Sequence, residues 1–295
     1  MMPHQLNWQE ICQMIPKRKA DAQKGDFGRL LCITGSRNMP GACLLSTQAA
    51  LRGGAGLVTV ATAPENPMRL AAAAPEAMWL PLETDEAGFL RSSDQNRKTL
   101  EKQLSRANAV LLGCGLGVTE ETRRLVYWVL EQAECPVVLD ADGLNCAVSC
   151  IELSRRTGKD WILTPHPGEM ARLTGHSIPQ IQENRVETAT QFAAAYPVTL
   201  ALKGAGTLVA QGSRLAQNPT GNPGMSRGGS GDVLAGLIAA FVAQGIPSWE
   251  AACAGVYLHG LAGDAAAAAL SQQAMLPRDL LVYLPQVLVK LEQER

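Results

Sequence analysis

The chain carries the glycine-rich segment Asn218-Pro-Thr-Gly-Asn-Pro-Gly-Met-Ser-Arg-Gly-Gly-Ser-Gly-Asp232, which runs directly into an apolar stretch of helical period, Val233-Leu-Ala-Gly-Leu-Ile-Ala-Ala-Phe241. A glycine-rich turn at the start of a helix leaves backbone N–H groups unpaired, with the positive end of the helix dipole behind them. The segment therefore predicts an anion hole. Its members are expected to be Gly228, Gly229, Ser230 and Gly231.

Asp232 is expected in the first turn of this helix, where a carboxylate has two roles open to it. A capping or dipole-compensating Asp is common at helix starts. The alternative is a catalytic base, because an Asp beside a phosphate-binding helix end is well placed to take a proton from an attacking hydroxyl. The number of glycines around it exceeds what a cap requires, as though the backbone must pass close to a ligand. This favours the base.

Outward from this segment, short apolar or β-branched runs alternate with stretches of helical period, which predicts an α/β fold with a mostly parallel sheet covered by helices on both faces. The expected strands are Leu30–Thr34, Leu57–Thr62, Ala109–Gly113, Val137–Asp140, Trp161–Thr164, Val198–Lys203 and Thr207–Ala210. The expected helices are Ala42–Arg52, Glu120–Gln132, Gly168–Leu173, Ile181–Ala195, Gly231–Gln244 and Trp249–Leu270.

The chain is expected to divide into an N-terminal arm, residues 1–23, and one domain, residues 24–295, because no Pro/Ser-rich linker interrupts the rest. The basic run Lys17-Arg18-Lys19 in the arm is interpreted as a solvated face. Two alanine-rich stretches, Ala71–Ala74 and Ala265–Ala269, are interpreted as close-packed helix.

Composition argues against several partners. The net charge of −1 and the pI near 6.4 give no basic surface for nucleic acid. The start of the chain lacks the apolar run of a signal peptide, and other apolar stretches are interrupted too early to span a membrane, so we expect a cytoplasmic protein. The eight cysteines include no CxxC pair and are expected to be reduced core thiols.

Polar residues follow several of the expected strands. Lys203 ends an apolar strand, where its ammonium can meet a phosphate as a point charge. His166 stands between two prolines that restrict its loop, which favours ligand contact over a turn-stabilising hydrogen bond. Asp140 and Asn145, together with Glu169, are candidates to bind Mg²⁺ or water near the phosphates. An equally weighted alternative is that these side chains only stabilise turns.

The terminal Gly-Gly-Ser-Gly-Asp232 resembles the anion-hole motif of the ribokinase superfamily, whose Asp deprotonates the phosphate-accepting hydroxyl. Four further stretches, in the same order, are similar to those of the NAD(P)H-hydrate dehydratases. They are Lys24-Gly-Asp-Phe-Gly-Arg-Leu30, Val138-Leu-Asp-Ala-Asp-Gly-Leu-Asn145, Leu163-Thr-Pro-His-Pro-Gly-Glu-Met170 and Lys203-Gly-Ala-Gly-Thr207. The resemblance implies a ribokinase-like fold with no separate lid domain.

The resemblance also implies an activity: dehydration of the S epimer of hydrated NADH and NADPH (NADHX and NADPHX) with ADP, or ATP, as phosphoryl donor and with Mg²⁺. Asp232 is then the catalytic base. The residues implied for the hydrate are Ala42, Gly115, His166 and Asp232, and those implied for the AMP moiety are Lys203, Gly204, Ala205, Gly206, Thr207 and Gly231. A homo-oligomer, with a tetramer favoured, is also implied.

Two departures from the family pattern stand out. Cys114 occupies the centre of the turn Gly113-Cys-Gly-Leu-Gly117, where the family usually has proline. The segment before Lys24 is too short for the epimerase domain often fused to dehydratases, so we expect a separate epimerase. Two other functions are weighed against the dehydratase: a ribokinase-like kinase for a vitamin precursor or sugar, and a non-catalytic nucleotide sensor.

Overall fold

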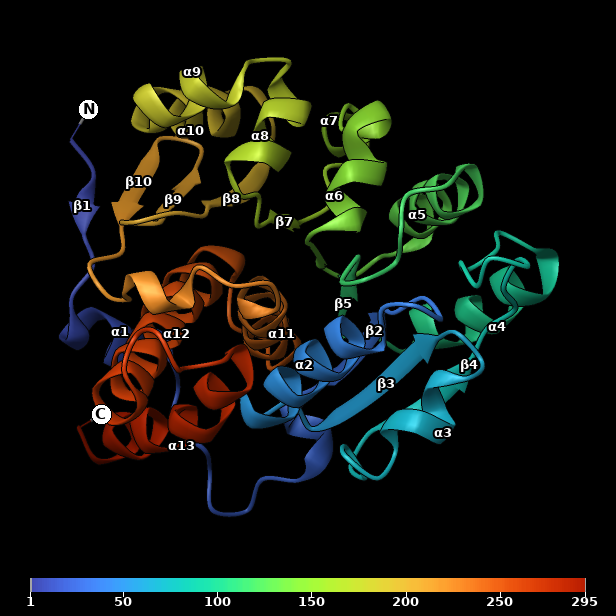
Figure 1. Cartoon of the computed structure of the whole chain (residues 1–295), viewed down its shortest axis with the longest axis horizontal. Helices are drawn as coiled ribbons and strands as arrows, with labels where there is room; N and C mark the ends of the chain where they lie inside the picture. The colour runs from blue at the N-terminus through green and yellow to red at the C-terminus, as the bar shows by residue number, and fades with distance from the viewer. Residues whose placement is uncertain (1, 295) are drawn as a thin grey trace.

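A ten-stranded sheet forms the centre of the molecule in the computed structural model, which describes residues 2–294 (Figure 1). The strand order is β1-β10-β9-β8-β7-β6-β5-β2-β3-β4. Within the described residues, β9 is antiparallel to both of its neighbours and every other pair is parallel. The strands are β1 (His4–Gln5), β2 (Arg29–Ile33), β3 (Leu57–Thr62), β4 (Met78–Pro81), β5 (Ala109–Leu112), β6 (Val137–Leu139), β7 (Trp161–Leu163), β8 (Val198–Leu202), β9 (Leu208–Gln211) and β10 (Arg214–Gln217).

All seven predicted strands are confirmed to within two residues, as β2, β3 and β5 to β9. The three strands that the prediction lacked lie at or near the sheet edges. β10 returns from β9 through the two-residue turn Gly212-Ser213, and β1 then pairs with β10. β4 is half-exposed and ends at Pro81, so it lacks the continuous apolar run of a central strand.

Helices cover both faces of the sheet (Figure 1). Alternate side chains of each strand point to opposite faces, and two separate hydrophobic cores result. The first core includes α1 (Trp8–Met14), α2 (Pro40–Arg52), α3 (Asn66–Leu70), α11 (Ser230–Ala243), α12 (Ser248–Leu270) and α13 (Pro277–Glu294). The second includes α4 (Asp94–Leu104), α5 (Glu120–Gln132), α6 (Asp142–Ala147), α7 (Leu153–Thr157), α8 (Pro167–Thr174), α9 (Ile178–Glu183) and α10 (Arg185–Ala195).

Two helix predictions are wrong in part. Ala71–Ala74 forms a turn after α3 rather than a helix, because Pro75 disfavours helical backbone in the residue before it. The single helix predicted over Ile181–Ala195 is two helices, α9 and α10, separated at Asn184. The stretch Ala265–Ala269 is helical within α12, as predicted, but Ala268 and Ala269 are exposed, so only part of it is close-packed.

The segment before residue 24 contributes two elements to the same body. β1 adds to the sheet, and α1 buries Ile11 fully in the first core. Lys17-Arg18-Lys19 lies beyond α1, where the Arg18 guanidinium stacks on Phe27 at 3.9 Å from the ring centroid and donates to the Gly54 carbonyl. The domain boundary at residue 24 stays a prediction.

Helix α11 is the element that fixes the position of the glycine-rich segment. It is buried along nearly its whole length between the sheet and α2. A Cβ atom on Gly236 would lie 2.2 Å from the Ser46 carbonyl oxygen, so glycine permits this close approach of α11 to α2. The N-terminus of α11 is thereby held beside the carboxyl ends of the central strands, where ligands bind in open α/β sheets.

None of the eight cysteines, all within the described residues, forms a disulfide, as predicted. Six of them are buried, whereas Cys12 and Cys135 are partly exposed and lie outside the predicted core. Among residues 2–294, no helix combines the length and the apolar character that a bilayer-spanning segment needs.

Candidate active site

A cavity of about 770 Å³ opens at the carboxyl ends of β6, β7 and β8 and reaches the first turn of α11. Its walls come from the loops that follow these strands, from the glycine-rich segment and from α12. The lining includes Asp140, Ala141, His166, Glu169, Lys203–Thr207, Asn218–Pro223, Met225–Asp232, Leu234, Val256, His259 and Gly260. A cavity of this size is suited to a small molecule or nucleotide.

Most of the residues selected from the sequence meet in this cavity. The predicted anion-hole residues 228–231, the segment 203–207, His166, Asp140, Glu169 and Asp232 all line it. Asn145 is not among them, because its side chain accepts a hydrogen bond from Arg172. Ala42 and Gly115 are also outside the lining and lie against each other, since a Cβ on Gly115 would stand 2.9 Å from that of Ala42.

Four adjacent parallel strands deliver the polar side chains. Cys114 lies in the turn after β5, Asp140 directly after β6, and Lys203 directly after β8. His166 follows β7 by three residues. Ala141, next to Asp140, has a φ of 50°, a backbone conformation that is costly for a residue with a side chain. Such strain at a cavity wall is typical of functional sites.

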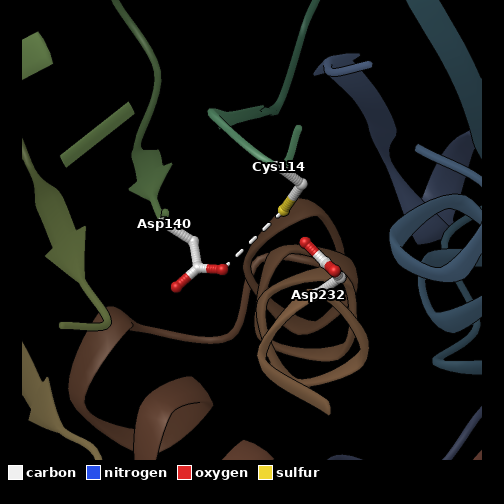
Figure 2. A group of neighbouring side chains, drawn as sticks. All are labelled: Cys114, Asp140 and Asp232. Carbon is white, nitrogen blue, oxygen red and sulfur yellow. Dashed lines mark hydrogen bonds between the residues drawn. The ribbon is translucent and has the colours of Figure 1, made fainter. Parts of the chain in front are cut away.

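Asp232 lies in the first turn of α11, and its carboxylate faces Cys114 and Asp140 (Figure 2). The N-cap of this helix is Gly229, at φ 106°, and no side chain caps it, so Asp232 does not act as the N-cap. Burial, followed by the nearby charge of Asp140, raises the pKa of Asp232 to about 7. A carboxyl group with this pKa is poised to exchange a proton near neutral pH.

Cys114 connects the two carboxyl groups. Its Sγ lies 3.9 Å from Oδ2 of Asp140, and ligand atoms of Cys114, Asp140 and Asp232 all lie within 4.8 Å of one another (Figure 2). Burial raises the pKa of this thiol well above its usual value, and the charges of Asp232 and Asp140 add to the effect. Cys114 therefore stays a protonated, weak hydrogen-bond donor beside them.

Lys203 is the cation of the cavity floor. Its Nζ donates to Oδ1 of Asp140 at 2.6 Å and lies 3.8 Å from Oε2 of Glu169, while Thr164 donates to the same Asp140 oxygen at 2.7 Å. Burial alone would lower the pKa of Lys203, but the charges of Asp140 and Glu169 outweigh it and raise that pKa. Lys203 therefore remains charged.

His166 caps helix α8. Its Nδ1 accepts hydrogen bonds from the backbone N–H groups of Gly168 at 2.9 Å and Glu169 at 3.3 Å. Its Nε2 lies 3.3 Å from Oε1 of Glu169. Burial, followed by the charge of Lys203, lowers the pKa of His166. Nδ1 accepts from backbone N–H groups and so carries no hydrogen, which places the hydrogen of the neutral ring on Nε2, near the Glu169 carboxylate.

Sequence reasoning missed two side chains at this site. His259, which lines the cavity, stands alone in the apolar run of α12, and its isolation there is the one signal that could have marked it. Arg185, at the start of α10, lies behind the segment 203–207. Its Nη1 donates to the Ala205 carbonyl and its Nη2 to that of Leu202 at 3.1 Å.

A mostly parallel sheet without a separate lid, together with a glycine-rich helix start that ends in an inward-facing Asp, defines a ribokinase-like α/β protein. The family model for NAD(P)H-hydrate dehydratase matches residues 30–286. The chain belongs to this family.

Relatives and a solved structure agree with this membership. The chain is 43% identical over 281 residues to the bifunctional NAD(P)H-hydrate repair enzyme Nnr of Moorella thermoacetica, covering 95% of this chain but 53% of that protein. The chain thus spans about half the length of the first curated relatives it matches. It is 38% identical to the ADP-dependent (S)-NAD(P)H-hydrate dehydratase of Neisseria meningitidis, covering 84% of this chain and 80% of that one.

One similar solved structure is an ADP/ATP-dependent NAD(P)H-hydrate dehydratase from Bacillus subtilis, co-crystallised with ATP and Mg²⁺. It superimposes with a TM-score of 0.81 at 31% identity, covering 98% of this chain and 99% of that chain.

Proposed function

We propose that the chain is an ADP-dependent dehydratase that converts the S epimer of NADHX or NADPHX into NADH or NADPH and releases AMP and phosphate. The observation that carries the proposal is the Asp232 carboxylate, which stands at the N-terminus of α11 inside a nucleotide-sized cavity with a pKa of about 7. The names of the Neisseria and Bacillus relatives support the donor and the substrate.

The reaction uses Asp232 as the base. In the hydrate, a hydroxyl sits on the ring carbon next to the nicotinamide nitrogen, and hydroxide is a poor leaving group. Asp232 takes the hydroxyl proton while the oxygen attacks the terminal phosphorus of ADP, the bond from that phosphorus to the bridging oxygen breaks, and AMP leaves. The nitrogen lone pair then expels phosphate, and loss of a neighbouring proton restores the dihydropyridine.

The charge on the transferring phosphoryl group is stabilised by the first turn of α11 and by Lys203. Backbone N–H groups at a helix start point toward an anion without reorganising, which favours the transition state. Asp140 fits a hard cation, since Oδ1 holds Lys203 and Thr164 while Oδ2 faces Cys114 and Asp232. Mg²⁺ held there would neutralise phosphate charge, and it needs few protein ligands.

His166 contacts the hydrate through its ring, in this account. Nδ1 already holds helix α8 and Nε2 lies beside the Glu169 carboxylate, while 52% of the side chain is exposed at the cavity wall. Its face is therefore the part it offers to the nicotinamide. Ala42 and Gly115 complete the hydrate site. Gly115 directly follows Cys114, and the Cys114 Sγ lies within 4.8 Å of a carboxylate oxygen of Asp232.

The segment 203–207 and Gly231 receive the AMP moiety. Arg185 holds this segment from behind through the Ala205 carbonyl and through that of Leu202, the residue before the segment. Arg185→Met is therefore expected to raise the KM for ADP about tenfold, equal to about 1.4 kcal/mol, and to change kcat little. Steady-state kinetics with ADP as the varied substrate measure this. The matched control is Arg155→Met, because Arg155 also donates to a backbone carbonyl, that of Ala195, outside the cavity lining. An equal KM in the two variants would contradict the role of Arg185.

A direct assay separates the proposed dehydratase from its rivals. The protein is incubated with NADH hydrate, Mg²⁺ and either ADP or ATP, and phosphate and dihydronicotinamide absorbance are followed together. A dehydratase releases one phosphate for each dihydronicotinamide formed. A kinase would accumulate a stable phosphorylated product, and a sensor would bind ADP with no substrate-dependent release of phosphate.

The setting of the enzyme is also part of the proposal. We place it in the cytoplasm as a homo-oligomer, with a tetramer favoured, and with an epimerase activity that supplies the S epimer. The relatives named as bifunctional NAD(P)H-hydrate repair enzymes support a second repair activity beside that of the dehydratase. The oligomeric state is measured by light scattering of the purified chain.

A further inference from the structure

Helix α12 crosses behind the glycine-rich segment and holds its first half. The Asn218 side chain donates to the Val256 carbonyl at 3.1 Å, and the Thr220 hydroxyl donates to the Tyr257 carbonyl at 2.9 Å. The Asp264 carboxylate accepts from the Gly221 backbone N–H at 2.9 Å. These contacts explain how the segment enters the cavity wall in one conformation although it is rich in glycine.

His259 makes the corresponding contact to the end of the segment. Its Nε2 lies 3.0 Å from the backbone carbonyl oxygen of Ser230, the first residue of α11. Because a carbonyl oxygen only accepts, Nε2 carries the hydrogen and donates. The side chain is buried, and burial lowers the pKa of His259 to about 4, so the ring is neutral at physiological pH.

The Ser230 carbonyl and the Gly231 N–H belong to one planar peptide unit and point in opposite directions. Fixing the direction of the carbonyl therefore fixes the direction of the N–H. Ser230 is the first residue of α11, so its carbonyl also begins the hydrogen-bond ladder of the helix. The glycines at 228, 229 and 231 make the backbone around it easy to rotate, and the His259 N–H is a second donor that restrains this peptide plane. In the first turn of a helix, the Gly231 N–H has no preceding helical carbonyl to bind and remains free for an anion.

We propose that His259 is a positioning residue of the dehydratase, which holds the peptide plane between Ser230 and Gly231 so that the Gly231 N–H points at the transferring phosphoryl group. This inference rests on the proposed function. It assigns His259 no contact with the reacting atoms and no proton transfer. His259 affects phosphoryl transfer only by orienting the Gly231 N–H.

The test compares two substitutions at this position. His259→Leu removes the donor, and His259→Gln keeps an N–H donor on a side chain of similar reach. Loss of one donor from a preorganised anion hole lowers kcat by about 10² to 10³, and misdirecting it should cost about tenfold or more. We expect His259→Leu to lower kcat at least tenfold with the KM values for ADP and hydrate within about threefold, and His259→Gln to recover most of the loss.

Two outcomes would overturn the inference: an unchanged kcat in His259→Leu, or an equal loss in both variants. Inactive wild-type protein would count against the proposed function instead. A second experiment uses the wild-type chain and so does not depend on whether a variant folds. It measures the ¹⁵N chemical shifts of the histidine rings between pH 6 and 8. They should show His259 as the neutral form with hydrogen on Nε2, and a charged ring or hydrogen on Nδ1 would also overturn the inference.

Discussion

Asp232→Asn is expected to lower kcat by about 10² or more while the KM for ADP changes by less than about threefold. The amide has nearly the shape of the carboxyl group but cannot accept the hydroxyl proton. The anion hole of backbone N–H groups is unchanged by the substitution, so nucleotide binding should persist. Steady-state kinetics for turnover and calorimetry for ADP binding measure the two effects separately.

The same variant should be more stable than the parent protein at alkaline pH. The pKa of Asp232 is about 7 in the folded chain and near its ordinary value of 3.8 in the unfolded one. The folded state therefore favours the protonated form, and stability is lost as pH rises from about 4 to 7. Asn has no such loss, so the stability difference should grow by up to about 1.4 kcal/mol per pH unit across this range and level off above it.

Asp94→Asn is the matched control for both effects. Asp94 lies in the first turn of α4, as Asp232 does in α11, but its side chain is exposed and outside the cavity lining. Turnover and the pH dependence of stability should stay unchanged in this variant. Near-normal turnover in Asp232→Asn would remove Asp232 from the mechanism, and a stability difference that is flat with pH would contradict its buried, shifted carboxyl group.

Lys203→Met should have the largest effect on the folded state and on nucleotide binding. The substitution leaves the Asp140 carboxylate, which is 1% exposed, without its cation and beside Asp232. Breaking a buried pair on one side costs about 3–5 kcal/mol. Loss of the ammonium also removes the positive charge that faces the phosphates. Urea denaturation should show the loss of stability, and calorimetry should show ADP affinity reduced at least about tenfold.

A second variant separates these two roles. Lys203→Met combined with Asp140→Asn removes both charges of the pair, so most of the stability should return, whereas ADP binding and turnover should stay low. The contradicting result is a single variant as stable as the parent protein, or a double variant that regains activity. Either would show that the pair of Lys203 and Asp140 is not the charged floor of the site.

The sequence predicted the centre of the fold because central strands of a parallel sheet are buried on both faces and read as continuous apolar runs. The strands at the edges of the sheet were harder to predict. β1 and β4 are partly exposed, and β10 depends on a hairpin after β9, so their local patterns are weak. The alanine run at 71–74 has high helix propensity, but Pro75 overrides it.

The site was predicted one loop at a time, and the loops were placed correctly at the strand ends. What the sequence does not contain is the pairing between loops. Asp140 and Lys203 are 63 residues apart and meet only because β6 and β8 flank β7 in the sheet. Asn145, five residues after the end of its expected strand at Asp140, hydrogen-bonds to Arg172 once α6 forms. The hydrogen bond of His259 to the Ser230 carbonyl forms only because α12 packs against α11, which the sequence does not show.

In the proposed reaction the hydrate hydroxyl is phosphorylated before it leaves, and an oxygen label on that hydroxyl follows this step. NADH hydrate is prepared with ¹⁸O in its ring hydroxyl and turned over with ADP and Mg²⁺ in unlabelled water. Each phosphate released should carry one ¹⁸O atom, because the labelled oxygen leaves attached to phosphorus. Label recovered in water, with unlabelled phosphate, would contradict it.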